Sequence, residues 1–155
     1  MLHKCGHTIT GDGKGCCTYI KTDEKCDNFW NINNEHCQAL TFLMDGNEIY
    51  LTVVYLKSNA PLGYIRGCFQ QLYQKLPHKT ESHIIVGDFN FDTKQSNPLS
   101  SLFIKDMGLR QLVQRPTHRE GRTIDHCYIS PNIECQIKFI NQYYSDHTSL
   151  CIKLK

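Results

Sequence analysis

A series of short apolar runs with strand character, separated by turn residues, limits this chain to a fold built around β-sheet. Residues 38–44 and 48–56 form two such runs with Asp45-Gly46 between them, which is a strong hairpin signal. Further runs with strand character lie at 16–21, 83–86, 110–113, 124–129, 133–140 and 150–154.

Two segments depart from this pattern and have helical features. Apolar residues recur at helical spacing over 62–76, which predicts an amphipathic helix; they are Ile65, Phe69, Leu72, Tyr73 and Leu76. A second helix is expected to begin at Asn97-Pro98, as N-cap and first-turn proline, and to end at Gly108. A hairpin, a helix, a strand, a helix and several strands predict a mixed α/β fold with mostly antiparallel sheet.

Composition excludes several classes of protein. A length of 155 residues fits one domain of ordinary size. Hydrophobic residues make up 40% and charged residues 21%, which excludes a disordered chain, a collagen-like repeat and a coiled coil. The formal net charge of only +2 does not indicate binding of nucleic acid by bulk charge, so any phosphate must be bound at a local site.

The nine cysteines form an odd-numbered set, which argues against a complete disulfide framework. No apolar signal region follows Met1, and the longest apolar-rich run, 49–56, is far too short to span a membrane. We therefore expect an intracellular protein of the nucleus or cytoplasm, not secreted and with no membrane partner. Most cysteines are expected to act as small buried hydrophobic residues.

Potential zinc ligands crowd the first quarter of the chain, so a zinc-bearing nucleic-acid-binding module is an alternative from a different class. No CxxC pair is present and the spacings match no standard zinc finger. The residues concerned are Cys5, His7, Cys16, Cys17, Cys26, His36 and Cys37.

The clearest chemical signal is the end of the apolar run 84–86. Gly87 is followed by Asp88 and Asn90, whose side chains point to the same side if the chain is extended, while Phe89 points the other way into the core. Gly87 is expected to let the chain turn and a ligand approach closely. A carboxylate and an amide would thus be presented together at a strand end, a common place for sites in α/β proteins.

Two further acidic motifs come later in the chain. Asp125 stands at the start of an apolar strand, and Asp146 and His147 stand side by side before the apolar run 150–152. Each alone is typical of a strand edge or a surface turn. A carboxylate beside His147 would fix its tautomer and favour the imidazolium.

Taken together, these groups suit hydrolysis of a phosphate ester. Asp146 with a second carboxylate could hold a hard divalent cation, because Mg²⁺ often takes only one or two protein carboxylates. Asp88 and Asn90 could position an attacking water or stabilise a pentacoordinate phosphorus.

The ordered motifs resemble those of the endonuclease/exonuclease/phosphatase family, which includes deoxyribonuclease-like and abasic-site endonucleases. The resemblance covers about residues 15–155, and its motifs are Gly87-Asp88-Phe89-Asn90, Thr123-Ile124-Asp125 and Ser145-Asp146-His147. It implies an α/β (α+β) fold, a four-layered sandwich of two packed mixed β-sheets with outer helices. Thr117-His118, Gly121 and the segment 143–147 look most like endonuclease domains of mobile elements.

The resemblance also implies roles for single residues. Asp88 would orient or deprotonate the attacking water, and Asn90 would hold the phosphate. Asp125 would hydrogen-bond to His147, which would contact the scissile phosphate. Asp146, together with Asp88, would bind Mg²⁺ or Mn²⁺.

Other candidates lie around this set. Tyr55, at the end of the run 51–55, falls where the family places a tyrosine that contacts phosphate, and Ser58 or Asn59 falls where a polar helper is usual. Asn59 and Arg122 are the further candidates for substrate binding. Arg122 is one of four arginines close together in the sequence, which form either a solvated face or a strip that contacts the phosphate backbone. They are Arg110, Arg115, Arg119 and Arg122. His118 and His126 are interpreted as loop and strand-edge residues, not ligands.

The chain departs from the family pattern in its first part. The family opens with a strand that ends in asparagine and a second that ends in a metal-binding glutamate, and no such segment precedes 16–21. Asp12, Asp23 and Glu24 lie in turn-like sequence. We therefore expect one partial domain over 1–155 that lacks its first strands and a main metal ligand.

The sequence thus predicts a metal-dependent phosphodiesterase, with a DNA endonuclease of retrotransposon or mobile-element type as the main hypothesis. One alternative is a catalytically inactive fragment or nucleic-acid-binding module. Another is a phosphatase or lipid phosphodiesterase of the same family, because these enzymes share the same catalytic set.

Overall fold

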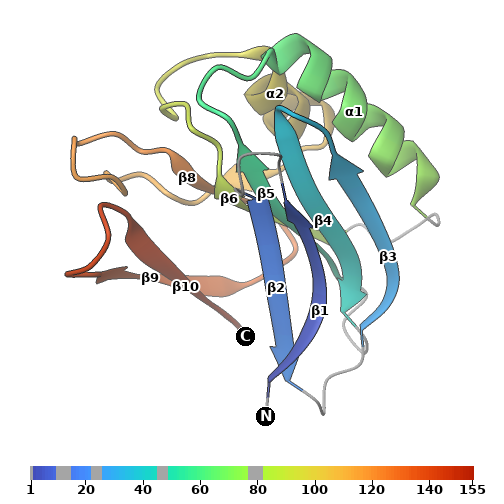
Figure 1. The fold of residues 1–155 in the computed structure, drawn as a ribbon, viewed down its shortest axis with the longest axis horizontal. Helices are drawn as coiled ribbons and strands as arrows, with labels where there is room; N and C mark the ends of the chain where they lie inside the picture. The colour runs from blue at the N-terminus through green and yellow to red at the C-terminus, as the bar shows by residue number, and fades with distance from the viewer. Residues whose placement is uncertain (1, 10–14, 22–25, 45–48, 77–81) are drawn as a thin grey trace.

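The computed structural model describes residues 2–9, 15–21, 26–44, 49–76 and 82–155. Its largest element is a six-stranded sheet in the order β3-β4-β5-β6-β8-β7 (Figure 1). Its strands are Cys26–Asn33 (β3), Cys37–Met44 (β4), Ile49–Leu56 (β5), Ser82–Asp88 (β6), Arg110–Gln111 (β7) and Asp125–Ile129 (β8). Strands β5 and β6 are parallel and the other neighbours in this sheet are antiparallel, which confirms a mostly antiparallel sheet.

Two antiparallel pairs accompany this sheet. Leu2–Ile9 (β1) pairs with Gly15–Lys21 (β2), and Cys135–Asn141 (β9) pairs with Thr148–Leu154 (β10). Strands β1 and β3 have no counterpart among the predicted runs, because their apolar residues are irregularly spaced and form neither a continuous stretch nor a strict alternation. The Asp45-Gly46 turn lies outside the described residues, but β4 and β5 pair antiparallel on either side of it, as predicted.

Both predicted helices are present. Helix α1 spans Leu62–Lys75 and buries Ile65, Phe69 and Leu72, in agreement with the helical period. The other helix begins as α2 (Pro98–Ser101) and continues as a π-helical turn, η1 (Leu102–Asp106). The Asn97 side chain accepts hydrogen bonds from the first-turn amides, as an N-cap should, and Gly108 has a φ of +67° just beyond the end.

The two faces of the six-stranded sheet carry separate apolar clusters. The helices cover one face, where Val54, Ile85 and Phe89 are buried with helix residues. The β9–β10 pair covers the other, where Ile84 and Cys127 are buried. Strand β2 also contacts β4 and β5, and the Cys16 thiol donates to the Gln38 carbonyl at 3.4 Å. This layering is that of the expected sandwich.

The described cysteines are free thiols, and several are core residues. Cys16, Cys37 and Cys127 are buried, and burial raises the pKa of Cys16 and Cys127 to about 12. Among the described members of the predicted zinc set, none belongs to a group that could hold a metal ion. The side chains of Cys5, His7 and Cys26 lie outside the description. In the described segments, no helix has the length and apolar character needed to cross a bilayer.

Candidate active site

Three of the predicted site residues form a row across the middle of the sheet. Tyr55 of β5 is the register partner of Asp88 of β6, which in turn is the partner of Asp125 of β8. Side chains alternate along a strand, so Asp88 and Asp125 share a face with Val86 and Cys127, the face that β9–β10 covers. Strand register therefore brings together residues 33 and 37 positions apart in the chain.

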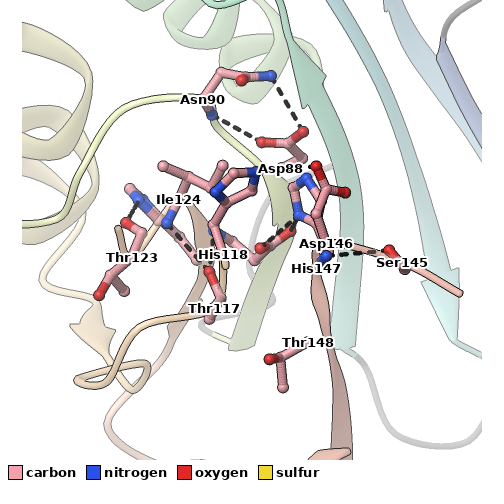
Figure 2. Close-up of polar contacts among 12 residues, drawn as sticks. Asp88, Asn90, Thr117, His118, Thr123, Ile124, Ser145, Asp146, His147 and Thr148 are labelled. Atoms are coloured by element: carbon pink, nitrogen blue, oxygen red, sulfur yellow. Dashed lines mark hydrogen bonds and ion pairs between the residues drawn. The ribbon is translucent and has the colours of Figure 1, made fainter. Parts of the chain in front are cut away.

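Asp88 and Asn90 lie together, but not because the chain is extended between them as expected. Strand β6 ends at Asp88, and Asn90 has a φ of +54°, so the chain turns back instead of remaining extended. The Asn90 backbone N–H donates to Asp88 Oδ1 at 2.9 Å, and its Nδ2 donates to Asp88 Oδ2 at 3.1 Å (Figure 2). The same Nδ2 also donates to the Leu56 carbonyl at 2.7 Å. The amide thus clamps the carboxylate against the end of β5.

Gly87 lies where strands β5 and β6 approach closely, and it also lines the open pocket beside Asp88. A Cβ on this residue would overlap the backbone carbonyl of Val54, and its φ is +152°. The close approach of the two strands thus requires glycine here, and the expectation that Gly87 lets a ligand approach stays a prediction. This glycine therefore sets the position of Asp88 relative to Tyr55.

The core behind the site is aromatic. Phe89 is buried, as predicted, and its ring stacks on that of His126 with centroids 4.8 Å apart. His126 is the second residue of β8, outside the part of the strand that pairs with β7, and its ring is fully buried. Its Nε2 donates to the Phe91 carbonyl at 2.9 Å and its Nδ1 accepts from the Tyr128 hydroxyl at 3.0 Å. Burial lowers the pKa of His126 to about 4, which keeps it neutral.

An acid–imidazole pair lies at the end of the row. His147 Nδ1 lies 2.9 Å from Asp125 Oδ2, so the contact implied by the family resemblance is present. Partial burial alone lowers the pKa of His147, but the hydrogen bond and charge of Asp125 outweigh this and raise it above the ordinary value. Two hydroxyls hold the pair in place: Thr117 Oγ1 accepts from the Asp125 amide at 3.0 Å, and Ser145 Oγ accepts from the His147 amide at 3.1 Å.

Asp88 stands in a half-buried, acidic environment. Burial raises the pKa of Asp88 to about 6; the hydrogen bond from the Asn90 amide opposes this shift and the charge of Asp125 adds to it. A carboxylate with a pKa near neutrality can exchange protons with water, as a general base requires.

A second cluster combines Asp146 and two histidines. His118 Nε2 lies 3.2 Å from Asp146 Oδ2, and the His118 and His147 rings meet edge to face at 5.1 Å (Figure 2). One ligand atom from each of His118, Asp146 and His147 lies within 4.8 Å of the others, so the cluster could hold a divalent cation. Asp88, the predicted partner of Asp146, does not belong to this group.

Sequence reasoning missed His118. It does lie in a loop, but a bridge between residues 118 and 147 ties that loop to the start of β10, and the Thr148 amide donates to the Thr117 carbonyl at 2.7 Å. The sequence signal that could have identified His118 was the Thr117-His118 pair shortly before Gly121. The Gly121 amide donates to the His118 carbonyl and so forms a turn.

The remaining candidates lie at the rim or away from the row. Asn59 is exposed in the turn after β5, three residues beyond Leu56. Arg122 forms an ion pair with Glu120 at 2.7 Å. The arginine strip is divided, because Arg115 stacks on Phe139 at 4.3 Å and Arg110 reaches the Ile133 carbonyl.

An open pocket of about 520 Å³ lies over Asp88 and Asp125, two of the three residues of the row. Asp88, Asp125 and His147 line it together with Tyr144 and the start of β10. A phosphate could therefore reach both carboxylates and the imidazole from one side.

Known structures share this architecture at low sequence identity. The endonuclease domain of TRAS1, a telomere-specific non-LTR retrotransposon, superposes with a TM-score of 0.72 and 16% identity, over 99% of this chain and 78% of that one. The Bacteroides thetaiotaomicron mannosyl-6-phosphatase Bt3783 gives a TM-score of 0.65 and 13% identity, over 99% of this chain and 77% of that one. The human Nocturnin catalytic domain gives 0.64 and 19%, over 92% of this chain and 65% of that one.

Searches against protein-family models and curated proteins found no match. Further structures at comparable similarity are described as endonuclease/exonuclease/phosphatase family proteins from Bacteroides vulgatus and Leptotrichia buccalis. On the strength of its layered sheets and these superpositions, this chain has the fold of the endonuclease/exonuclease/phosphatase proteins.

Proposed function

We propose that this chain is a metal-dependent phosphodiesterase that cleaves DNA, an endonuclease of the mobile-element type. The observation that carries the proposal is an open pocket lined by Asp88, Asp125 and His147, with His147 hydrogen-bonded to Asp125. Tyr55 is the register partner of Asp88 on the neighbouring strand. The likeness to the TRAS1 endonuclease domain supports the choice of DNA.

The residues divide the chemistry between them. Asp88 accepts a proton from the attacking water, helped by its raised pKa, and Asn90 holds the carboxylate in place. The His147 imidazole, whose charged form is favoured by Asp125, stabilises negative charge on the phosphoryl oxygens. Tyr55 adds a phenol from β5 at the same level of the sheet.

Oxygen ligands for a cation are available at the edge of this row. Asp146 and Asp88 are the carboxylates proposed to hold Mg²⁺ or Mn²⁺. When bound, the cation would neutralise charge that develops on the phosphate. Asp88 fits the cation only in part, because its carboxylate also accepts two hydrogen bonds from Asn90.

The test is nicking of supercoiled plasmid with Mg²⁺ or Mn²⁺ and with EDTA. We expect cation-dependent nicking that Asp88→Asn and His147→Ala each reduce at least about 100-fold. Glu134→Gln is the matched control, because it removes an exposed carboxylate that pairs only with Lys155 among the described residues. Absence of nicking by the unmodified chain, or equal nicking by the site variants, would refute the proposal.

A phosphomonoesterase is the second candidate, favoured by the likeness to a mannosyl-6-phosphatase. Release of inorganic phosphate from a sugar phosphate, with no nicking of plasmid, would identify it. The same two site variants would then abolish phosphate release.

A further inference from the structure

Two adjacent tyrosines at the tip of the β9–β10 hairpin are unusually exposed. Tyr143 is 96% and Tyr144 74% exposed, far beyond what aromatic side chains normally show. Their rings contact each other edge to face, with centroids 5.1 Å apart. The pair thus presents aromatic surface to solvent instead of contributing to the core.

These tyrosines are placed beside the proposed reaction centre. Tyr144 lines the same pocket as Asp88, Asp125 and His147. Only Ser145 and Asp146 separate it from His147, and the Ser145 hydroxyl fixes the His147 backbone. The tip is therefore held at a set distance from the group that would contact the phosphate.

One basic residue and several polar groups lie near the pair. The Arg119 amide donates to the Asp146 carbonyl at 2.8 Å, which brings this exposed arginine to the same rim. Gln142 and Ser145, which flank the pair in sequence, are polar. Aromatic rings beside a cation and polar groups are typical of surfaces that stack nucleobases, because every base presents a π-face. A lipid surface would require a broader apolar patch around the two rings.

We propose that Tyr143 and Tyr144 form a stacking platform for an unpaired nucleobase next to the scissile phosphate. This inference rests on the proposed function and deepens it, because it names single-stranded or locally unpaired nucleic acid as the substrate class. The phosphate would lie over Asp88 and His147 while the neighbouring base stacks on the tyrosine pair.

The test measures binding without cleavage. Fluorescence anisotropy in EDTA compares a dT₁₂ oligonucleotide with a 12-mer of abasic spacers that carries the same phosphates. We expect the unmodified chain to bind dT₁₂ more tightly. Tyr143→Ala/Tyr144→Ala should weaken binding to dT₁₂ roughly 10-fold and leave the abasic 12-mer unchanged. Tyr143→Phe/Tyr144→Phe should retain affinity, because phenylalanine keeps the stacking face.

Several outcomes would overturn the inference. One is an equal loss on both oligonucleotides, and another is no loss on dT₁₂. A third is binding of the unmodified chain to phosphatidylserine-containing vesicles that the alanine variant loses, with no change in its binding to dT₁₂. That result would indicate a membrane contact. If the chain binds dT₁₂ more tightly than the abasic 12-mer but does not nick plasmid, only the proposed catalysis is refuted. Failure of the stacking platform can therefore be distinguished from failure of the proposed function.

Discussion

At the scale of single residues, environment decides what an ionisable group can do. His126 and His147 are both imidazoles of the β8–β10 region, and their pKa values shift in opposite directions. His126 is enclosed by aromatic rings, whereas His147 faces Asp125. The first is a neutral core residue, and the second is suited to bind a phosphate.

The buried His126 predicts acid sensitivity. Its folded pKa of about 4 lies below its ordinary value of 6.5, although Asp125 and Asp92 nearby oppose the shift. The folded state therefore disfavours the proton, and the stability present above pH 6.5 is lost as pH falls towards 4. We expect the free energy of unfolding to fall by at most about 3 kcal/mol over this window, as measured by urea denaturation.

The matched variant is His126→Gln, which keeps hydrogen-bonding capacity and cannot titrate. Its loss of stability between pH 6.5 and 4 should be clearly smaller. Identical pH profiles for the two proteins would contradict this assignment.

His118 predicts an effect on cation dependence. Asp146 is exposed, and His118 Nε2 is the side-chain donor that holds its carboxylate; the Glu120 amide donates to His118 Nδ1 and thereby fixes the tautomer. His118→Ala should release Asp146 and raise the Mn²⁺ concentration for half-maximal nicking several-fold. His36→Ala, in the turn between β3 and β4, is the control. An unchanged Mn²⁺ requirement would show that His118 has no part in positioning Asp146.

At the scale of elements, much of the arrangement is foreseeable from local pattern. Helix α1 follows its apolar period, and Asn97-Pro98 starts α2 where expected. Strands β1 and β3 are not predicted from the sequence because neither contains a local apolar run. They are strands because they pair with neighbouring strands.

Strand β6 predicts a sharp requirement for glycine. Gly87→Ala places a methyl group against the Val54 carbonyl at a φ of +152°, so β5 and β6 must separate. We expect a loss of at least about 2 kcal/mol of unfolding free energy, measured by denaturant titration. Gly63→Ala in α1 meets nothing within 4 Å and should be neutral or stabilising. Equal effects of the two substitutions would refute the close-approach argument.

At the scale of the whole molecule, the layered packing determines thiol reactivity. Cys17 and Cys151 are exposed, whereas Cys16, Cys37 and Cys127 are buried between layers with raised pKa values. A thiol reagent such as DTNB should modify the first two quickly and the other three only after unfolding. Fast modification of Cys127 in the native protein, mapped by mass spectrometry, would contradict the described packing.

What the sequence determined by itself was the chemistry and its order along the chain. The motifs at Asp88, Asp125 and His147 could be recognised because each follows or begins an apolar run, a property of local sequence. The pairing of Asp125 with His147 followed only from family resemblance, and the structure contains that contact.

Only the tertiary structure decided which side chains meet. Strand register, a property of pairing across the sheet, set Tyr55, Asp88 and Asp125 in one row. The contact of His118 with Asp146 depends on a bridge between residues 118 and 147, which lie 29 positions apart, and no local period encodes it. Burial, which shifts the pKa values of Asp88 and His126, exists only once the layers have packed.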